Sequence, residues 1–247
     1  MQVHLRTFAP MKQTVRFTDL GTVEYKECWD MQEELLAEMV QLKTAARNGV
    51  PNTSKPQHKL LFVEHPPVFT LGKSGKMEHV LLSDEDRVKK GIEFFQINRG
   101  GDITYHGPGQ LVGYPIFDLE QFYTDIGKYL RNLEEVIIRL LESYGLKGER
   151  SPGETGVWLQ PGIRGRERKI CAIGVRCSRW VTMHGFAFNV NTNLDHFNFI
   201  IPCGIQQKQV TSLQKELDRP IDMEEVKERT RKYFEEVFQI DIKTLSE

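Results

Sequence analysis

Short strand-like runs occur in clusters in this sequence, and stretches of helical periodicity separate the clusters. Strict alternation of single strands with helices would indicate a parallel α/β sheet, whereas clustered strands are typical of sheets with antiparallel pairing. The sequence therefore predicts an α+β fold, with a mixed, mostly antiparallel sheet flanked by helices. No repeat or linker-like stretch divides the chain, so we expect one domain over residues 1–247.

The periodicity predicts helices at residues 24–47, 83–91, 126–144 and 222–238. In the third of these, Leu133, Ile137 and Leu140 repeat at the spacing of one helix face. Asp222 with Glu225 has the spacing of a capping box at the start of the fourth. Strands are expected at residues 59–63, 68–71, 93–97, 103–105, 111–117, 156–159, 169–177 and 181–189.

The charges are balanced, because 33 Lys and Arg residues accompany 34 Asp and Glu residues, for a formal net charge of −1. This balance argues against a protein whose whole surface binds nucleic acid. No apolar run approaches the roughly 20 residues needed to span a bilayer, and residues 1–12 lack the apolar core of a signal peptide. We therefore expect a cytoplasmic protein with neither a membrane nor a nucleic-acid partner.

The four cysteines are Cys28, Cys171, Cys177 and Cys203, and their spacing fits neither a zinc site nor a C-x-x-C redox pair. Cys171 and Cys177 fall in one expected strand, where six residues span about 20 Å, beyond disulfide reach. Reduced thiols are therefore expected, which suits a reducing compartment, and no metal site is predicted.

Residues 99–110, with the sequence RGGDITYHGPGQ, form the most unusual local stretch. Glycine allows sharp turns and close approach of the backbone to a ligand. The stretch matches neither a P-loop nor a G-x-G-x-x-G fingerprint, so a nucleotide phosphate site has no direct support. By composition alone, a β-hairpin with glycines at its bends is the favoured interpretation.

The same run, Arg99-Gly100-Gly101-x-x-Thr104-Tyr105-His106-x-x-x-Gln110, closely resembles the signature of the octanoyl-acyl-carrier-protein:protein N-octanoyltransferases, or lipoyl(octanoyl) transferases. Five further blocks resemble that family in the same order and spacing, from about residue 61 to residue 213. They are residues 65–72 (HPPVFTLG), 154–158 (ETGVW), 169–174 (KICAIG), 184–189 (HGFAFN) and 202–204 (PCG). Six ordered blocks are much more specific than one glycine motif.

The resemblance implies a fold shared with the catalytic domains of biotin and lipoate protein ligases. It also implies the first step of endogenous protein lipoylation. An octanoyl group would pass from the phosphopantetheine of octanoyl-acyl carrier protein to a lysine of a lipoyl domain. Such domains belong to 2-oxoacid dehydrogenase complexes and the glycine cleavage H protein. The resemblance implies no resident cofactor, since the acyl group travels on the carrier, and we expect a monomer.

Cys203 is the candidate nucleophile, flanked by Pro202 and Gly204. A thiolate can attack a thioester and hold the chain as an acyl-enzyme. The resemblance assigns Lys169 as its partner, because an ammonium close to sulfur lowers the pKa of the thiol. Without the resemblance, Cys203 could be a small core residue and Lys169 a surface lysine. Cys171 and Cys177 are alternative nucleophiles, but both are expected to pack in the sheet.

The resemblance also carries over the substrate-binding positions. Small residues on adjacent expected strands would leave a slot for the acyl chain, although a tightly packed sheet also suits them. We hypothesise that the amides of Gly100 and Gly101 form an oxyanion site. His106 could transfer a proton or be structural, and Asp102 receives no individual role. The expected positions are Arg99, Gly100, Gly101, Asp102, Ile103, Thr104, Tyr105, His106, Ala172, Ile173, Gly174, Gly185, Phe186 and Ala187.

A basic rim is a further hypothesis, since acyl carrier proteins are acidic and such a rim would steer docking. Its members would be Lys73, Arg164, Arg166, Arg168 and Lys208, although a solvated loop explains residues 164–168 as well. Three other functions compete with the leading one: an ATP-dependent lipoate or biotin ligase, a non-catalytic acyl-binding module, and an amidotransferase that moves octanoyl between two protein domains.

Overall fold

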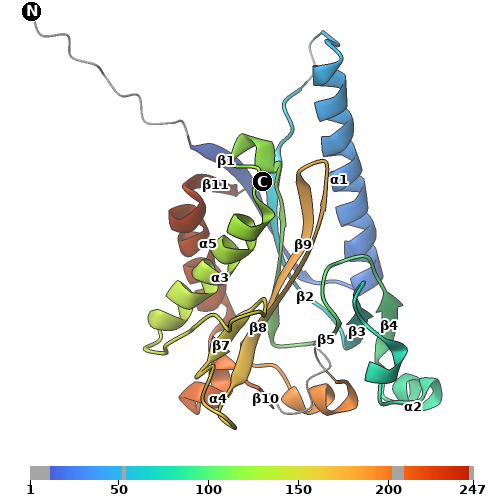
Figure 1. The fold of residues 1–247 in the computed structure, drawn as a ribbon, viewed down its shortest axis with the longest axis vertical. Coiled ribbons are helices and arrows are strands. Elements are labelled where there is room, and N and C mark those ends of the chain that lie inside the picture. Colours follow the sequence, from blue (N-terminus) through green and yellow to red (C-terminus); the bar gives the residue numbers. More distant parts are fainter. Residues whose placement is uncertain (1–11, 52–53, 202–208, 245–247) are drawn as a thin grey trace, which may run out of the picture.

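The computed structural model describes residues 12–51, 54–201 and 209–244 (Figure 1). Its helices are α1 (Tyr25–Arg47), α2 (Asp84–Lys89), α3 (Ile126–Glu142), α4 (Leu213–Leu217) and α5 (Met223–Phe238), with short 3-10 turns at Met77–His79, Leu119–Gln121 and Leu194–Phe199. Its strands are β1 (Gln13–Thr22), β2 (His58–Glu64), β3 (Val68–Leu71), β4 (Glu93–Gln96), β5 (Ile103–His106), β6 (Gln110–Ile116), β7 (Val157–Leu159), β8 (Arg168–Ser178), β9 (Val181–Asn189), β10 (Gln209–Val210) and β11 (Ile240–Thr244).

The main sheet has the strand order β10-β8-β9-β6-β2-β1-β11, and β7 pairs with β8 outside this path. Its centre is antiparallel, because β2, β6, β9 and β8 pair in succession with opposite directions. The outer pairs β1–β2, β1–β11 and β10–β8 are parallel. A second, three-stranded sheet has the order β4-β3-β5. The predicted α+β class with a mixed, mostly antiparallel sheet is therefore confirmed.

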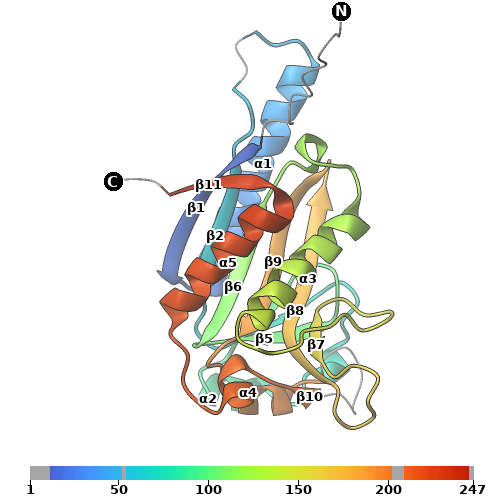
Figure 2. The ribbon, with the colours of Figure 1, turned by 90° about the vertical axis from the view of Figure 1, so that its left-hand side faces the viewer.

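Helices cover both faces of the main sheet (Figure 2). On one face, α3 and α5 bury an apolar cluster that includes Leu133, Ile137 and Phe234. On the other face, α1 packs Cys28, Leu36 and Met39 against residues of β6 and β9. The small sheet lies at one end of the α1 face (Figure 1). In the described parts of the chain, no helix is both long enough and apolar enough to cross a membrane.

The expected helices are confirmed to within two residues at their ends, and Ser83 and Asp222 are N-caps whose side chains accept backbone amides. The predicted capping box between Asp222 and Glu225 is wrong. The side chain of Asp222 accepts the amide of Glu224, and the carboxylate of Glu225 pairs with Arg229. Cys171 and Cys177 lie in the same strand, β8, and both are free thiols, as expected.

Buried histidines give the fold a dependence on pH, and among the described residues His58 and His65 are two of the four whose pKa is lowered by burial. Nδ1 of His58 accepts the amide of Asp118 (3.2 Å), and His65 is bonded to the carbonyl of Val23 (2.7 Å) and the hydroxyl of Tyr114 (2.8 Å). Burial lowers the pKa of both imidazoles to about 4. Both are therefore neutral in the folded protein at neutral pH.

We predict that stability falls as the pH is lowered from about 6.5 to 4. An unfolded histidine titrates near pH 6.5, so in this window the unfolded chain binds more protons than the folded one. The free energy of unfolding therefore rises with pH across the window. Urea denaturation between pH 4 and 8 measures it, and a His58→Asn variant, which keeps a side-chain acceptor for Asp118, should show a shallower slope. Equal slopes in the two proteins would contradict the assignment to His58.

Candidate active site

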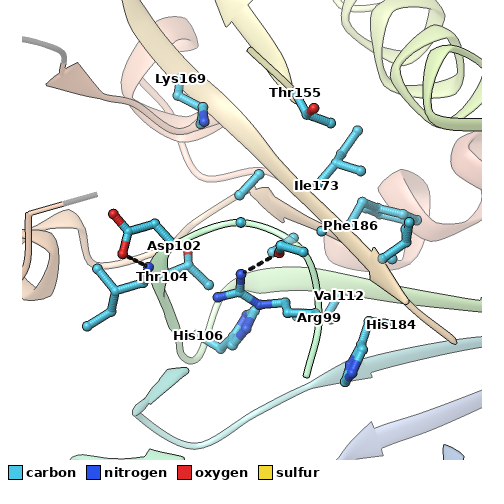
Figure 3. A pocket seen from close by; sticks show the side chains of 18 of the residues that line it. Arg99, Asp102, Thr104, His106, Val112, Thr155, Lys169, Ile173, His184 and Phe186 are labelled. Atoms are coloured by element: carbon cyan, nitrogen blue, oxygen red, sulfur yellow. Dashed lines mark hydrogen bonds between the residues drawn. The ribbon is translucent and has the colours of Figure 1, made fainter. Parts of the chain in front are cut away.

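A cavity of about 710 Å³ lies where the segment between β4 and β5 meets strands β8 and β9 (Figure 3). Its volume is in the range of small-molecule sites. Lys169 lines it, and so do all of the predicted substrate-binding positions except Tyr105: Arg99, Gly100, Gly101, Asp102, Ile103, Thr104, His106, Ala172, Ile173, Gly174, Gly185, Phe186 and Ala187. Segments far apart in the sequence therefore converge on one site.

The small residues of β8 and β9 face one another in register. Ala172 pairs with Ala187, and Gly174 pairs with Gly185. A Cβ on Gly174 would lie 2.7 Å from the carbonyl oxygen of Gly100, so only glycine lets that loop approach the strand so closely. The expected slot is thus present, with β8 and β9 forming one wall and the glycine-rich segment forming the other.

Tyr105 lies outside the cavity, contrary to expectation. It alternates with Thr104 and His106 along β5, so its side chain points to the other face of the small sheet. There its ring stacks on His196, with centroids 4.8 Å apart, and contacts Phe69 edge-on. Ile103, which shares the parity of Tyr105 at the start of β5, still lines the cavity, so alternation alone does not decide which residues of the block line it.

A directed chain of hydrogen bonds runs beneath the cavity. The guanidinium of Arg99 donates to the carbonyl of Thr70 (2.7 Å) and to its hydroxyl (3.0 Å), and that hydroxyl meets Nε2 of His106 (3.3 Å). Nδ1 of His106 meets the side-chain oxygen of Gln110 (2.8 Å). The amide nitrogen of Gln110 donates to Oδ1 of Asn189 (2.9 Å) and to a backbone carbonyl. The chain ties the small sheet to the main sheet.

The network favours a structural role for His106. Because the nitrogen of Gln110 is already donating, its oxygen accepts from Nδ1–H, which leaves Nε2 to accept from Thr70. Burial, reinforced by His65, holds the pKa of His106 well below its usual range. A neutral ring with both nitrogens engaged holds the cavity wall in place.

The oxyanion hypothesis fails for Gly100, because its amide donates to the carbonyl of Val175 (3.0 Å). This bond pins the loop to β8 and consumes the donor that the hypothesis needs. Gly101 lies at φ +88°, a conformation that favours glycine. A substitution at Gly101 would therefore strain the backbone whatever its catalytic effect.

Lys169 stands at the end of β8 where β10 joins it, and its carbonyl accepts the amide of Thr211 (2.9 Å). Its ammonium lies 4.6 Å from the centre of the Trp158 ring. Cys203, its predicted partner, lies outside the described residues, and so does Lys208. The prediction that Cys203 is the nucleophile beside Lys169 stays a prediction.

The three described cysteines are poor candidates for the nucleophile. Burial raises the pKa of Cys28 to about 12, and it also raises the pKa of Cys171 and of Cys177 above the usual value of a thiol. A thiol with a raised pKa is protonated at neutral pH and attacks slowly. Cys171 is also fully buried in the cluster under α3 and α5.

The hypothetical basic rim is only partly present. Lys73, Arg164 and Arg166 are exposed. Arg168 instead forms two 2.6 Å hydrogen bonds with the carboxylate of Glu216, which neutralises its charge. Within the described residues, no group of three or more His, Cys, Asp or Glu side chains is arranged to hold a metal ion.

Several cavity residues were not predicted. Nδ1 of His79 lies 2.7 Å from a carboxylate oxygen of Asp102, which gives Asp102 a partner at the cavity wall. Glu154 and Thr155 also line the cavity. These two lie in the ETGVW block, so the signal that could have found them was present in the sequence.

Comparison with known proteins agrees with this geometry. The family model described as the lipoyl protein ligase A/B catalytic domain matches residues 24–235. An octanoyltransferase of Christiangramia forsetii is 57% identical over 235 residues, covering 94% of this chain and 99% of the relative. One of Flavobacterium psychrophilum is 54% identical over 233 residues, covering 94% and 100%.

A solved structure titled as a bipartite lipoate protein ligase and its E2 lipoyl domain, from Thermoplasma acidophilum, has a TM-score of 0.64. The likeness covers 96% of this chain and 88% of that one at 19% identity, so it shows the shared fold. The sequence identities to the two octanoyltransferases extend over nearly the whole of each chain. The chain therefore belongs to the lipoyl protein ligase A/B catalytic domain family and, within it, is an acyltransferase of the lipoyl(octanoyl) transferase type.

Proposed function

We propose that this acyltransferase takes an octanoyl group from the phosphopantetheine thioester of an acyl carrier protein and passes it, through a thioester on Cys203, to a lysine of a lipoyl domain. The observation that carries the proposal is the slot between β8, β9 and the glycine-rich segment, with Lys169 at one end. Each CH₂ of an acyl chain buried there contributes about 0.8 kcal/mol. The scheme needs no resident cofactor.

The first half of the reaction exchanges one thioester for another. The thiolate of Cys203 attacks the octanoyl carbonyl, a carbon–sulfur bond to the enzyme forms, and the bond to phosphopantetheine breaks. The leaving thiolate takes a proton from the ammonium of Lys169. The products are the octanoyl-enzyme, the free thiol of the carrier and a neutral Lys169.

The second half makes the amide. The amine of the acceptor lysine attacks the enzyme thioester, a carbon–nitrogen bond forms, and the thiolate of Cys203 leaves. The proton lost by the amine goes to the neutral amine of Lys169, which restores the starting thiolate and ammonium. Raised pKa values make the other described thiols poor carriers of the acyl group, which supports the choice of Cys203.

The partners follow from this chemistry. The donor would be octanoyl-acyl carrier protein, and the acceptors would be lipoyl domains of 2-oxoacid dehydrogenase complexes and the glycine cleavage H protein. The lipoate protein ligase of Thermoplasma acidophilum is described together with its E2 lipoyl domain, which supports this class of acceptor. The exposed Lys73, Arg164 and Arg166 would favour an acidic carrier. Action as a monomer in the cytoplasm is part of the same proposal.

We predict that mixing the protein with octanoyl-acyl carrier protein adds the mass of one octanoyl group, without ATP. Cys203→Ser should abolish this adduct, whereas Cys177→Ser should keep it. Intact-mass spectrometry measures both. An adduct that survives Cys203→Ser would contradict the assignment of the nucleophile. Binding without any adduct in the wild type would favour an acyl-binding module, and a strict requirement for ATP would favour a ligase.

Lys169→Arg is predicted to separate the two half-reactions. Arginine keeps the positive charge beside the thiolate, but it does not accept a proton near neutral pH. The acyl-enzyme should therefore still form, while transfer to the acceptor lysine should slow by about 10²–10⁴-fold, the range for loss of a general base. Single-turnover assays with preformed octanoyl-enzyme measure this step. Full transfer by the variant would show that Lys169 is not the base.

Ala172→Leu is predicted to change the preferred length of the acyl chain. The half-buried Ala172 lines the slot opposite Ala187, so a larger side chain would occupy space that the octanoyl chain needs. We expect kcat/KM for the octanoyl donor to fall about tenfold or more, because the chain would lose contacts to about two CH₂ groups. The kcat/KM for a butanoyl donor should change little, because its shorter chain does not reach the added side chain. Ala37→Leu, on the exposed side of α1, is the control. Equal losses for both donors would refute the placement of the chain.

A further inference from the structure

Strand β8 carries an irregularity next to Lys169. Val157 of β7 lies opposite Cys171, but the next residue, Trp158, lies opposite Lys169. One step along β7 thus corresponds to two steps along β8, which leaves Ile170 as an extra residue. This is the pattern of a β-bulge, a feature that redirects side chains and is enriched next to active sites.

The bulge changes which way the neighbouring side chains point. In a regular strand, consecutive residues point to opposite faces. Here both Ile170 and Cys171 pack into the apolar cluster under α3 and α5. Lys169, immediately before this pair, lines the cavity instead (Figure 3). The extra residue therefore allows Lys169 to face the cavity while two successive side chains face the helices.

Gly156 allows the two strands to come together at this bulge. It lies at φ +122°, and a Cβ there would be 2.5 Å from the carbonyl oxygen of Cys171 and 3.5 Å from Cε of Lys169. A side chain at this position would clash with the carbonyl of Cys171 and push β7 away from β8. The amide of Gly156 donates to Oε1 of Glu134 in α3, at 3.0 Å.

Glu134 is a fully buried carboxylate with both oxygens engaged. Its side chain is 0% exposed, and its Oε2 accepts from Arg150 (3.0 Å) and pairs with Arg131 (2.7 Å). A buried charge is costly unless hydrogen bonds and counter-charges satisfy it. The two arginines satisfy one oxygen, and the other is directed to the single backbone amide that precedes β7.

We propose that Glu134 is a positioning residue for Lys169. Its carboxylate anchors Gly156, the anchored glycine keeps β7 against β8, and the resulting bulge directs Lys169 into the cavity. The inference rests on the role proposed for Lys169 in the transfer reaction. It adds that a residue on a helix outside the cavity controls the geometry of that lysine.

The test measures the rate of octanoyl transfer to a lipoyl domain in single-turnover assays. Glu134 variants are compared in the wild-type protein and in a protein that also carries Lys169→Ala. Glu134→Ala removes the acceptor for Gly156 and should slow transfer about 100-fold, the cost of a misplacement of about 1 Å. Glu134→Gln still offers an oxygen to that amide, but its NH₂ group then faces the donors of Arg131 and Arg150, so it should recover only part of the rate. Combined with Lys169→Ala, Glu134→Ala should cause no further loss, because the two changes disable the same group.

Asp118→Asn is the matched control, because Asp118 is another buried carboxylate, paired with Lys43 away from the cavity. It should lower Tm and leave the transfer rate unchanged at a temperature well below Tm. If Glu134→Ala does not fold, Gly156→Ala replaces it, with the same expected loss and the same lack of additivity with Lys169→Ala.

Three results would overturn the inference. Folded Glu134→Ala, or folded Gly156→Ala, could transfer octanoyl at the wild-type rate. The loss could be equally large in the wild-type and Lys169→Ala backgrounds, which would indicate a general structural defect. Lys169→Ala could itself transfer at full rate, in which case the proposed role of Lys169 fails as well. The first two results leave the proposed function intact.

Discussion

Arg99 and Gly100 together connect the two sheets at the wall of the cavity, and the buried guanidinium of Arg99 makes the contact with the small sheet. Arg99 is 8% exposed and donates to the carbonyl and the hydroxyl of Thr70 in the small sheet. Its neighbour Gly100 is bonded to Val175 at the edge of β8 in the main sheet. A buried cation needs acceptors around it. Thr70 of β3 and the carbonyl of Gly100 are among these acceptors, and they hold the loop as a wall of the cavity.

The rest of the wall is held by neutral polar groups. His106, Gln110 and Asn189 each use their donors and acceptors in one consistent direction, so rotating any one of them would leave buried groups unpaired. Buried polar networks that are fully satisfied are rigid. The site therefore combines a rigid network of buried polar side chains with an apolar slot. Lys169, the residue proposed to take part in the reaction, lies at one end of the slot.

Periodicity in the sequence predicted helices and strands that bury one face and expose the other. The α3 stripe is of this kind, whereas β9, which is buried along its whole length, was predicted from its apolar residues. Strand β1 escaped prediction because only Val15 and Phe17 in it are buried, so its ten residues read as polar. Strand β11 escaped because it follows α5 after a single residue, Gln239, in the left-handed conformation.

The site was predictable to the level of segments, and less so to the level of atoms. Tyr105 does not line the cavity, because its ring packs against His196 and Phe197 on the other face of the small sheet. The amide of Gly100 was expected to be available, and nothing in the sequence indicates that Val175 would engage it. The bulge at Ile170 was also beyond prediction, because a one-residue insertion in a strand depends on its partner strand and on the buried carboxylate of Glu134.

The parallel pairing of β1 with β11 has a consequence for how the chain folds. Gln13 lies opposite Ile240, so the two ends of the described chain are neighbours at the outer edge of the main sheet. Contacts between residues so distant in sequence are slow to form, because a long loop must close first. β1 therefore keeps one edge unpaired until β11 is in place, and completion of the sheet is a late step of folding.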